Sequence, residues 1–251
     1  MRSEIFSRSN RRLREFLDRK ERVYLLEGEK LVRDVLSRPI PVQKLIVLAD
    51  AENRFFPVPA RVEEIWVVNR PVMEKISDLK DIPECAVAFS ELERPIDFSG
   101  ERTVIGLDNI QDPANLGTIF RCASAFGIDA IALTGTGVNP RNTKFIRTAQ
   151  TALLDLRFQS FPEPAGIVDL ARKNHRHVYL TVAGHTRTAI GPDQVEDPCL
   201  IFFGNEGRGL TGEWLKLFPV VRLPQNPRID SLNVGVSACI VMYELQKRQK
   251  T

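Results

Sequence analysis

The sequence predicts an α/β protein in two parts, a small layered front segment and a larger domain built on a mostly parallel sheet. After residue 98, apolar runs of strand length alternate with helical stretches, which is typical of a parallel sheet covered by helices. These runs lie at 103–107, 129–133, 177–182, 199–203 and 220–223. A polar stretch from Glu91 to Arg102, containing Pro95 and Gly100, predicts a linker. We therefore place the two domains at 1–95 and 98–251.

The front segment alternates helices and strands, which predicts a small α/β layer structure. It begins with a charged helix, and a second helix is expected at about 29–37. Strands are expected at 42–48, 65–68 and 86–89, with a further helix after Pro71.

The helices of the second segment are expected between its strands. Asp112 is a good N-cap and Pro113 suits the first helical position, so a helix should run over 113–126 and end at Gly127. Further helices are expected at 142–153, 164–173 and 233–248.

Composition narrows the class of protein. No run approaches the roughly 18 apolar residues of a membrane span, and the N-terminus lacks the apolar core of a signal peptide. The four cysteines are scattered, at Cys85, Cys122, Cys199 and Cys239. Their spacing suggests neither a metal site nor a disulfide framework, and His175 and His177 are expected at the surface. We expect a cytoplasmic protein without a metal or a membrane partner.

The net charge of +3 is modest, but the basic residues are clustered. Residues 1–22 carry eight Arg or Lys against four acids, and residues 138–150 carry three basic residues and no acid. Either cluster alone is equally well explained as a solvated helix face, whereas two together favour a nucleic-acid partner. The candidate RNA-binding residues are Arg11, Arg12, Arg141, Lys144 and Arg147.

Three predicted strands end in unusual polar or glycine-rich turns. These turns are Asp108–Arg121, Gly204–Leu210 and the stretch from Pro224 to Asn233. Ligands bind beyond the carboxyl ends of strands in open α/β sheets, so these turns predict one pocket. Asn115 and Arg121 would bring an amide and a permanent cation to it, which suits an anion. The glycine turn lacks the Gly-Lys-Ser/Thr ending of a phosphate-binding loop.

At these three turns the sequence resembles the SpoU family of RNA ribose methyltransferases, within the SPOUT superfamily. The matching stretches are Asp112–Arg121, Gly204–Leu210 and Ser231–Val234. The front segment, with Ser9-Asn10 and Leu25-Leu26-Glu27-Gly28, resembles the L30e-like RNA substrate-binding domain that many members carry. The resemblance implies a deep trefoil knot in the second domain, S-adenosylmethionine as cofactor, and a homodimer formed through the C-terminal domain. The last helix suits such an interface, since Gly235, Ser237 and Ala238 permit close approach beside Ile240, Val241 and Leu245.

The resemblance also implies roles for residues of this chain. The catalytic group would be Asn115, Arg121, Glu206, Ser231 and Asn233. The cofactor would contact Thr181, Ala183, Gly184, Gly204, Asn205, Gly207, Leu223 and Leu232. Ala149 and Thr151 stand where many members have Ser and Gly, in a region that faces RNA in the family.

The expected function is therefore methylation of a ribose 2′-hydroxyl in RNA. A front domain of this size favours 23S ribosomal RNA as the substrate. The alternatives are a transfer RNA ribose 2′-O-methyltransferase and a non-catalytic RNA-binding protein on the same fold. A dinucleotide-dependent dehydrogenase is disfavoured because the fingerprint glycines and the following acidic residue are missing. An arginine side chain is a permanent cation, so we expect Arg121 to bind the target phosphate rather than act as a base.

Overall fold

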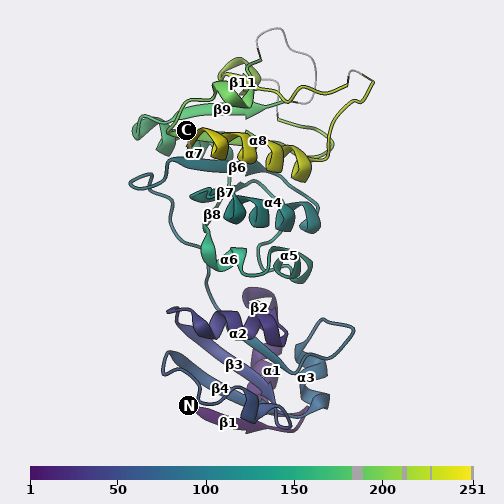
Figure 1. The fold of residues 1–251 in the computed structure, drawn as a ribbon. Coiled ribbons are helices and arrows are strands. Elements are labelled where there is room, and N and C mark those ends of the chain that lie inside the picture. Colours follow the sequence, from purple (N-terminus) through teal and green to yellow (C-terminus); the bar gives the residue numbers. More distant parts are fainter. Residues whose placement is uncertain (183–188, 211–213, 227, 250–251) are drawn as a thin grey trace. The chain divides into compact units, whose positions relative to one another are not determined.

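The computed structural model describes residues 1–182, 189–210, 214–226 and 228–249. The chain divides into two compact units (Figure 1). The first unit comprises Met1–Leu92 and Pro140–Thr151, and the second comprises Glu93–Asn139 and Ala152–Thr251. The segment Pro140–Thr151, which the sequence boundaries place in the second domain, groups with the first unit.

The first unit is built on a five-stranded mixed sheet with the order β1-β4-β3-β5-β2. Its strands are β1 (Arg2–Ile5), β2 (Tyr24–Glu27), β3 (Val42–Leu48), β4 (Val62–Val68) and β5 (Cys85–Phe89). Its helices are α1 (Arg11–Leu17), α2 (Glu29–Ser37), α3 (Arg70–Ile76) and α5 (Thr143–Ala149), with short 3₁₀ turns at Lys20–Arg22 and Glu52–Arg54. The alternation of helices and strands predicted for this segment is confirmed.

Two strands of this sheet, β1 and β2, were not predicted. In β1 only Ile5 is buried, so the four residues carry too little apolar pattern to signal a strand. β1 forms because it pairs in parallel with β4, from Arg2 opposite Ile65 to Ile5 opposite Val68. It precedes the charged helix α1, which was expected to begin the chain.

The second unit holds a six-stranded sheet in which all strands run parallel, with the order β11-β9-β10-β6-β7-β8. Its strands are β6 (Thr103–Asp108), β7 (Ala130–Thr134), β8 (Arg157–Phe161), β9 (His177–Thr181), β10 (Cys199–Phe203) and β11 (Val220–Val221). Five of these coincide with predicted apolar runs. The edge strand β8 was missed because its sequence, Arg-Phe-Gln-Ser-Phe, is mostly polar.

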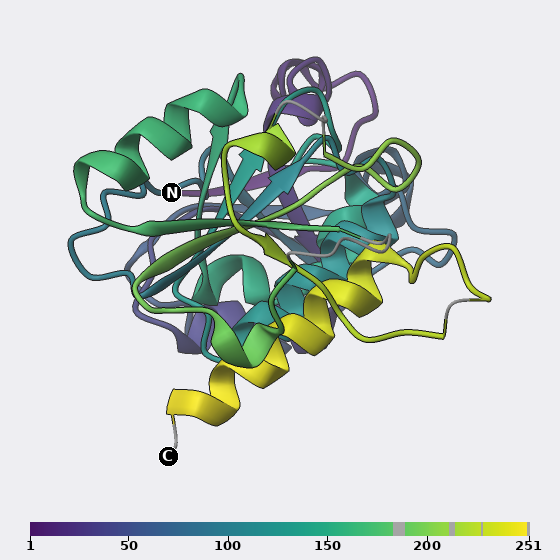
Figure 2. The same ribbon diagram turned by 90° about the horizontal axis from the view of Figure 1, so that it is seen from above.

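Helices cover both faces of this sheet. Figure 2 shows α7 on one side of the sheet, and α4 and α8 on the other. The helices are α4 (Pro113–Ala125), α6 (Ala152–Asp155), α7 (Pro164–Lys173) and α8 (Val234–Gln249), with 3₁₀ turns at Pro192–Gln194 and Trp214–Lys216. The core under α7 contains Val104, Leu200 and Phe202 beside Ile167 and Ala171.

The single helix predicted over 142–153 is two helices, α5 and α6. Gln150 has a φ of 53° and a ψ of −132°, which is outside the helical region. Its N–H still bonds to the Ile146 carbonyl, so α5 ends there and the chain turns into α6. The apolar pattern continues across the break, and nothing in it marks the turn.

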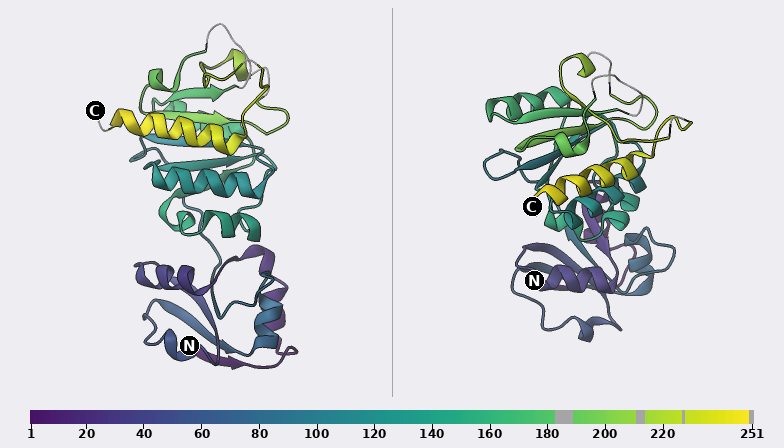
Figure 3. Two further views of the ribbon diagram at one scale, coloured as in Figure 1. Left: turned by 45° about the vertical axis from the view of Figure 1, so that its right-hand side comes forward. Right: turned by 45° about the horizontal axis from the view of Figure 1, so that its top comes forward.

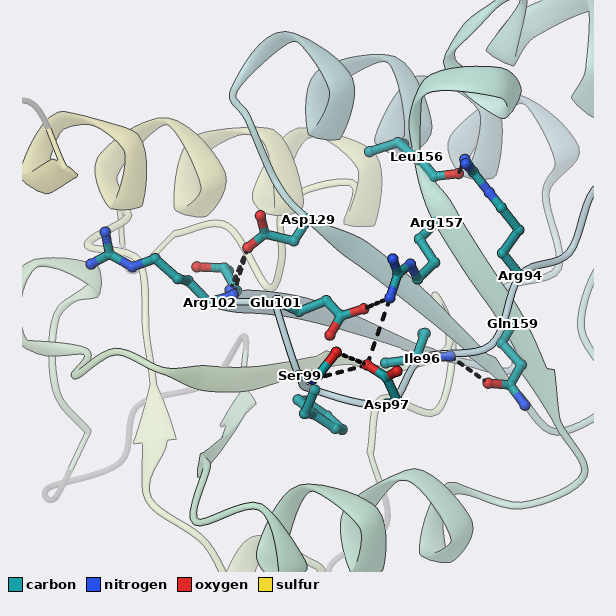
Figure 4. Close-up of polar contacts among 12 residues, drawn as sticks. Arg94, Ile96, Asp97, Ser99, Glu101, Arg102, Asp129, Leu156, Arg157 and Gln159 are labelled. Atoms are coloured by element: carbon teal, nitrogen blue, oxygen red, sulfur yellow. Dashed lines mark hydrogen bonds and ion pairs between the residues drawn. The ribbon is translucent and has the colours of Figure 1, made fainter. Parts of the chain in front are cut away.

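Much of the predicted linker is held against the second unit (Figure 4). The Ile96 N–H donates to Gln159 Oε1 at 2.8 Å, and Arg94 Nη2 donates to the Leu156 carbonyl at 2.6 Å. Arg157 lies 3.7 Å from Asp97 and pairs with Glu101, which is 3% exposed. Residues 93–102 therefore line the edge strand β8 as part of the fold.

Helices α4 and α8 lie side by side in both views of Figure 3. A disulfide joins Cys122 of α4 to Cys239 of α8, with the two Cα atoms 5.6 Å apart. The expectation that the cysteines form no disulfide is therefore wrong. The two residues are 117 positions apart, and only the packing of the two helices brings them together.

Candidate active site

A cavity of about 420 Å³ lies beyond the carboxyl ends of β9, β10 and β11. Thr181 ends β9, Phe203 ends β10, and Val221 ends β11, and all three line the cavity. Its volume is within the range of small-molecule sites. The position is the one predicted from the parallel sheet, because the three strand ends share one edge.

The three polar turns converge in space through a chain of side-chain hydrogen bonds. Asn115 Nδ2 donates to Glu206 Oε1 at 3.1 Å, and Asn233 Nδ2 donates to Asn115 Oδ1 at 3.0 Å. One amide therefore links the glycine-rich turn on one side to the start of α8 on the other. This convergence agrees with the prediction that the three turns, which are distant in the sequence, form one pocket.

Glu206 also holds the start of α4. Its carboxylate accepts hydrogen bonds from the backbone N–H groups of Gln111 and Asp112, both at 3.3 Å. Burial alone would raise the pKa of Glu206, but hydrogen bonds from its own backbone, from Asn115 and from these two N–H groups outweigh burial and lower it. The side chain is therefore ionised at neutral pH and places a negative charge at the cavity wall.

Asn233 begins α8 in the same way that Asp112 begins α4. Its Oδ1 accepts hydrogen bonds from the N–H groups of Gly235 and Val236, at 2.9 and 3.2 Å. This is an N-cap, which stabilises a helix by about 1 kcal/mol. The cap uses Oδ1 and leaves Nδ2 for Asn115, so the orientation of Asn233 is set by both contacts.

The glycine-rich turn folds tightly back on itself. Asn205 Oδ1 accepts hydrogen bonds from the N–H groups of Gly207 and Arg208, and Asn205 Nδ2 donates to the Asn109 carbonyl at 2.9 Å. A Cβ at Gly204 would lie 2.5 Å from Leu210 N and 2.8 Å from Gly209 O. Only glycine fits there, because both neighbours are backbone atoms.

The predicted cofactor-binding residues gather at the cavity wherever they are described. Those that line it are Thr181, Gly204, Asn205, Gly207, Leu223 and Leu232. Ala183 and Gly184 lie outside the described residues. The wall also contains residues that were not expected at the cofactor site, namely Val182, Phe203, Arg208, Gly209, Val221, Gln225, Val234, Ser237 and Val241. Arg208 and Gln225 are polar residues within the recognised turns, which was an available signal, whereas Val241 shows only core periodicity.

The predicted catalytic residues divide into two groups. Glu206, Ser231 and Asn233 line the cavity, and Asn115 is bonded to two of them. Arg121 does not line the cavity. It is exposed on α4, and its side chain has no hydrogen bond or ion pair to any described residue.

The predicted RNA-binding residues differ in how far the first unit engages them. Arg12 pairs with Glu64 and donates to Ser3 Oγ at 2.7 Å, and Arg141 donates to the carbonyls of Arg22 and Ser90. Both cations therefore tie together parts of the first unit. The side chain of Arg11 is 87% exposed, and Lys144 and Arg147 are exposed on α5.

No group of three or more His, Cys, Asp or Glu side chains within the described residues is placed to hold a metal ion. None of the helices in that part of the chain has the length and apolar character needed to cross a membrane.

Comparison with known proteins gives a family match over more than half of the chain. The model of the SpoU rRNA Methylase family matches residues 102–243, which include all three turns. The chain is 27% identical over 231 residues to the 23S rRNA (guanosine(2553)-2′-O)-methyltransferase RlmP of Bacillus subtilis, covering 90% of each chain. It is 33% identical over 144 residues to an uncharacterized tRNA/rRNA methyltransferase of Synechocystis, covering 57% of this chain and 52% of that protein. The chain thus matches about half the length of the second relative.

Solved structures show the same fold over the whole chain. An AdoMet-bound rRNA methyltransferase from Sinorhizobium meliloti has a TM-score of 0.83 and 24% identity, with 100% of this chain and 99% of that chain covered. The SpoU methyltransferase AviRb from Streptomyces viridochromogenes, in complex with AdoMet, has a TM-score of 0.80 and 19% identity, with 96% and 99% covered. These likenesses confirm the predicted α/β fold.

Proposed function

The chain belongs to the SpoU rRNA Methylase family, and on that premise we propose that it transfers a methyl group from S-adenosylmethionine to a ribose 2′-hydroxyl of RNA. The observation that carries the proposal is the hydrogen-bonded chain Glu206–Asn115–Asn233, which joins three separate motifs beside one cavity. Packing alone does not call for an ionised carboxylate, two amides and a glycine-rich turn at one sheet edge.

The residues of the cavity fit the cofactor. Val182, Leu223 and Leu232 offer an apolar surface for a nucleoside, and the glycine turn exposes backbone groups for polar contacts. The negative charge of Glu206 favours a cationic ligand. Bound S-adenosylmethionine would supply the methyl group from its sulfonium, which would leave as a neutral thioether.

The chain's own task is to place the ribose and to remove its proton. In the transfer, an O–CH₃ bond forms as the C–S bond breaks, and the hydroxyl proton leaves. The guanidinium of Arg121, a permanent cation, stabilises the developing alkoxide and holds the adjacent phosphate, and the proton passes to that phosphate or to water. Asn115 and Ser231 orient the ribose, and Glu206 and Asn233 hold the turns in place.

The substrate and the assembly belong to the same proposal. The Bacillus subtilis relative supports 23S ribosomal RNA as the substrate, and the first unit would bind that RNA as an L30e-like domain. A homodimer would form through α8, where Val236, Ile240 and Tyr243 are 48%, 38% and 47% exposed along one face. Of the residues expected at this interface, Ile240 is exposed and Ser237 is partly buried, whereas Gly235, Ala238, Val241 and Leu245 are buried within their own unit. The trefoil knot implied by the resemblance stays a prediction.

The test combines an RNA map with two substitutions. Ribose methylation is mapped across total RNA from cells with and without the protein, and one 23S ribosomal position should depend on it. Arg121→Ala should abolish transfer to that RNA while the affinity for S-adenosylmethionine, measured by calorimetry, stays within about twofold, because Arg121 does not line the cavity. Failure to bind S-adenosylmethionine would exclude the enzyme in favour of an RNA-binding protein. Full activity in Arg121→Lys would exclude bidentate hydrogen bonding by the guanidinium as the essential role of Arg121.

A further inference from the structure

A second cavity lies at the opposite end of β9 from the methyl-donor cavity. Its volume is about 250 Å³, and Arg172, Arg176, His177, Tyr179 and Phe218 contribute to its wall. β9 begins at His177, which lines this second cavity, and ends at Thr181, which lines the first. The lining residues of both cavities belong to the second unit.

Three basic residues, Arg172, Arg176 and His177, line this second cavity, and the chain around them is basic as well. Residues 172–177 read Arg-Lys-Asn-His-Arg-His, with no acid among them. Arg172, Lys173 and Arg176 form no ion pair with any described residue. His177 Nε2 lies 3.5 Å from Glu196, which is the one carboxylate paired with the cluster in the described part of the chain. The first unit differs, because many of its exposed arginines pair with nearby acids.

Aromatic rings hold two of the guanidinium groups in place. Arg172 lies over the ring of Phe218, with its Cζ 4.9 Å from the ring centroid, and Arg176 lies 5.7 Å from the ring centroid of Phe98. Arg176 also donates to the Phe98 carbonyl, and its buried Nε has no hydrogen-bond partner among the described residues. The cations are therefore positioned, and the protein's own acids do not neutralise them.

Cations at a helix end have an ordinary explanation, which covers only part of this cluster. Arg172 and Lys173 lie in the last turn of α7, where positive charge complements the helix dipole. Arg176 and His177 lie beyond the end of the helix, at the start of β9, and gain nothing from that effect. The dipole also gives no reason for a cavity with aromatic sides.

We propose that this basic cavity, lined by Arg172, Arg176 and His177 beside Phe218, is, together with the exposed Lys173 next to it in the chain, a second docking site for the sugar–phosphate backbone of the RNA substrate. Guanidinium groups match phosphate oxygens, and exposed unpaired cations release counterions when RNA binds. The site would hold RNA away from the ribose that is methylated. It acts on affinity and register, and has no part in the transfer step. The inference rests on the proposed function, because it assumes an RNA substrate.

The experiment measures methyl transfer to a 23S ribosomal RNA transcript and binding of a fluorescein-labelled single-stranded oligoribonucleotide. The double variant Arg172→Gln/Lys173→Gln should raise the KM for the transcript about tenfold and leave kcat and the affinity for S-adenosylmethionine unchanged. The slope of log affinity against log salt should fall by about 1 for each phosphate contact that is lost. The matched control, Arg172→Lys/Lys173→Arg, keeps both charges and should restore most of the binding.

A substitution of opposite sign separates docking from damage to the fold. Glu196→Gln removes the carboxylate beside His177 and should strengthen oligoribonucleotide binding by about two- to threefold. A wild-type protein that methylates the transcript, together with a double variant of unchanged KM and salt slope, would overturn the docking site alone. A wild-type protein that neither binds nor methylates any RNA would overturn the proposed function and the docking site with it.

Discussion

Replacing Gly204 by alanine tests whether the glycine-rich turn shapes the methyl-donor cavity. The added Cβ would lie 2.5 Å from Leu210 N and 2.8 Å from Gly209 O, and neither backbone atom can move aside by a side-chain rotation. Overpacking of this kind costs about 1–3 kcal/mol. The clash can be relieved only if the turn opens, and an open turn no longer fits the ligand, so the free energy of the clash weakens ligand binding. Each 1.4 kcal/mol lowers the affinity about tenfold. We expect S-adenosylmethionine to bind about 5- to 150-fold more weakly.

Isothermal titration calorimetry gives the affinity, and thermal unfolding monitors the fold. The control is Gly100→Ala, because a Cβ at Gly100 would meet nothing within 4 Å and this residue lies outside the cavity. The control should bind like the wild type. Equal affinities for Gly204→Ala, Gly100→Ala and the wild type would refute the claim that this turn forms the cofactor wall.

Three further predictions concern the contacts around the cavity. Glu206→Gln should lower the melting temperature at neutral pH. Because the folded-state pKa of Glu206 is lowered, the difference in melting temperature between wild type and variant should have its full size above about pH 4.3, and it should vanish as the pH falls through the folded-state pKa. A constant difference down to pH 2 would contradict this reasoning. Asn233→Ala should cost about 1 kcal/mol in urea unfolding through loss of the cap, and a double-mutant cycle with Asn115→Ala should give a coupling of about 0.5–1.5 kcal/mol, whereas strict additivity would deny their contact. Dithiothreitol should lower the stability of the oxidised protein by about 2–5 kcal/mol and leave Cys239→Ser unaffected, and equal responses would exclude the link to Cys122.

The sequence predicts the site better than it predicts the local path of the chain. The sequence was enough to predict that Asn115, Glu206 and Asn233 lie close together, because the carboxyl ends of parallel strands share one edge. Their direct hydrogen bonds could not be foreseen, since they depend on how α4 and α8 are placed. Ser237 was missed as a lining residue for the same reason, because its direction follows from the start of α8.

Elements whose formation depends on partners left little trace in the sequence. The edge strands β1 and β8 are short and mostly polar, and they exist because a neighbouring strand offers hydrogen bonds. The break at Gln150 lies in a stretch whose apolar pattern is continuous. The Cys122–Cys239 pair joins residues too far apart for their spacing to carry information. Local composition reports burial well, but it does not report contacts made across a long loop.

The return of Pro140–Thr151 to the first unit means that the polypeptide passes between the two units three times. A gene fragment starting near residue 98 would encode α5 without the sheet it packs on, and Phe145 and Ile146 would lose the shelter that leaves them 0% and 2% exposed. A fragment ending near residue 95 would lack α5 and expose the surface of the first unit that this helix covers. Neither half is a clean module for recombination, so we expect truncation, insertion and domain exchange at the apparent linker to yield poorly soluble products.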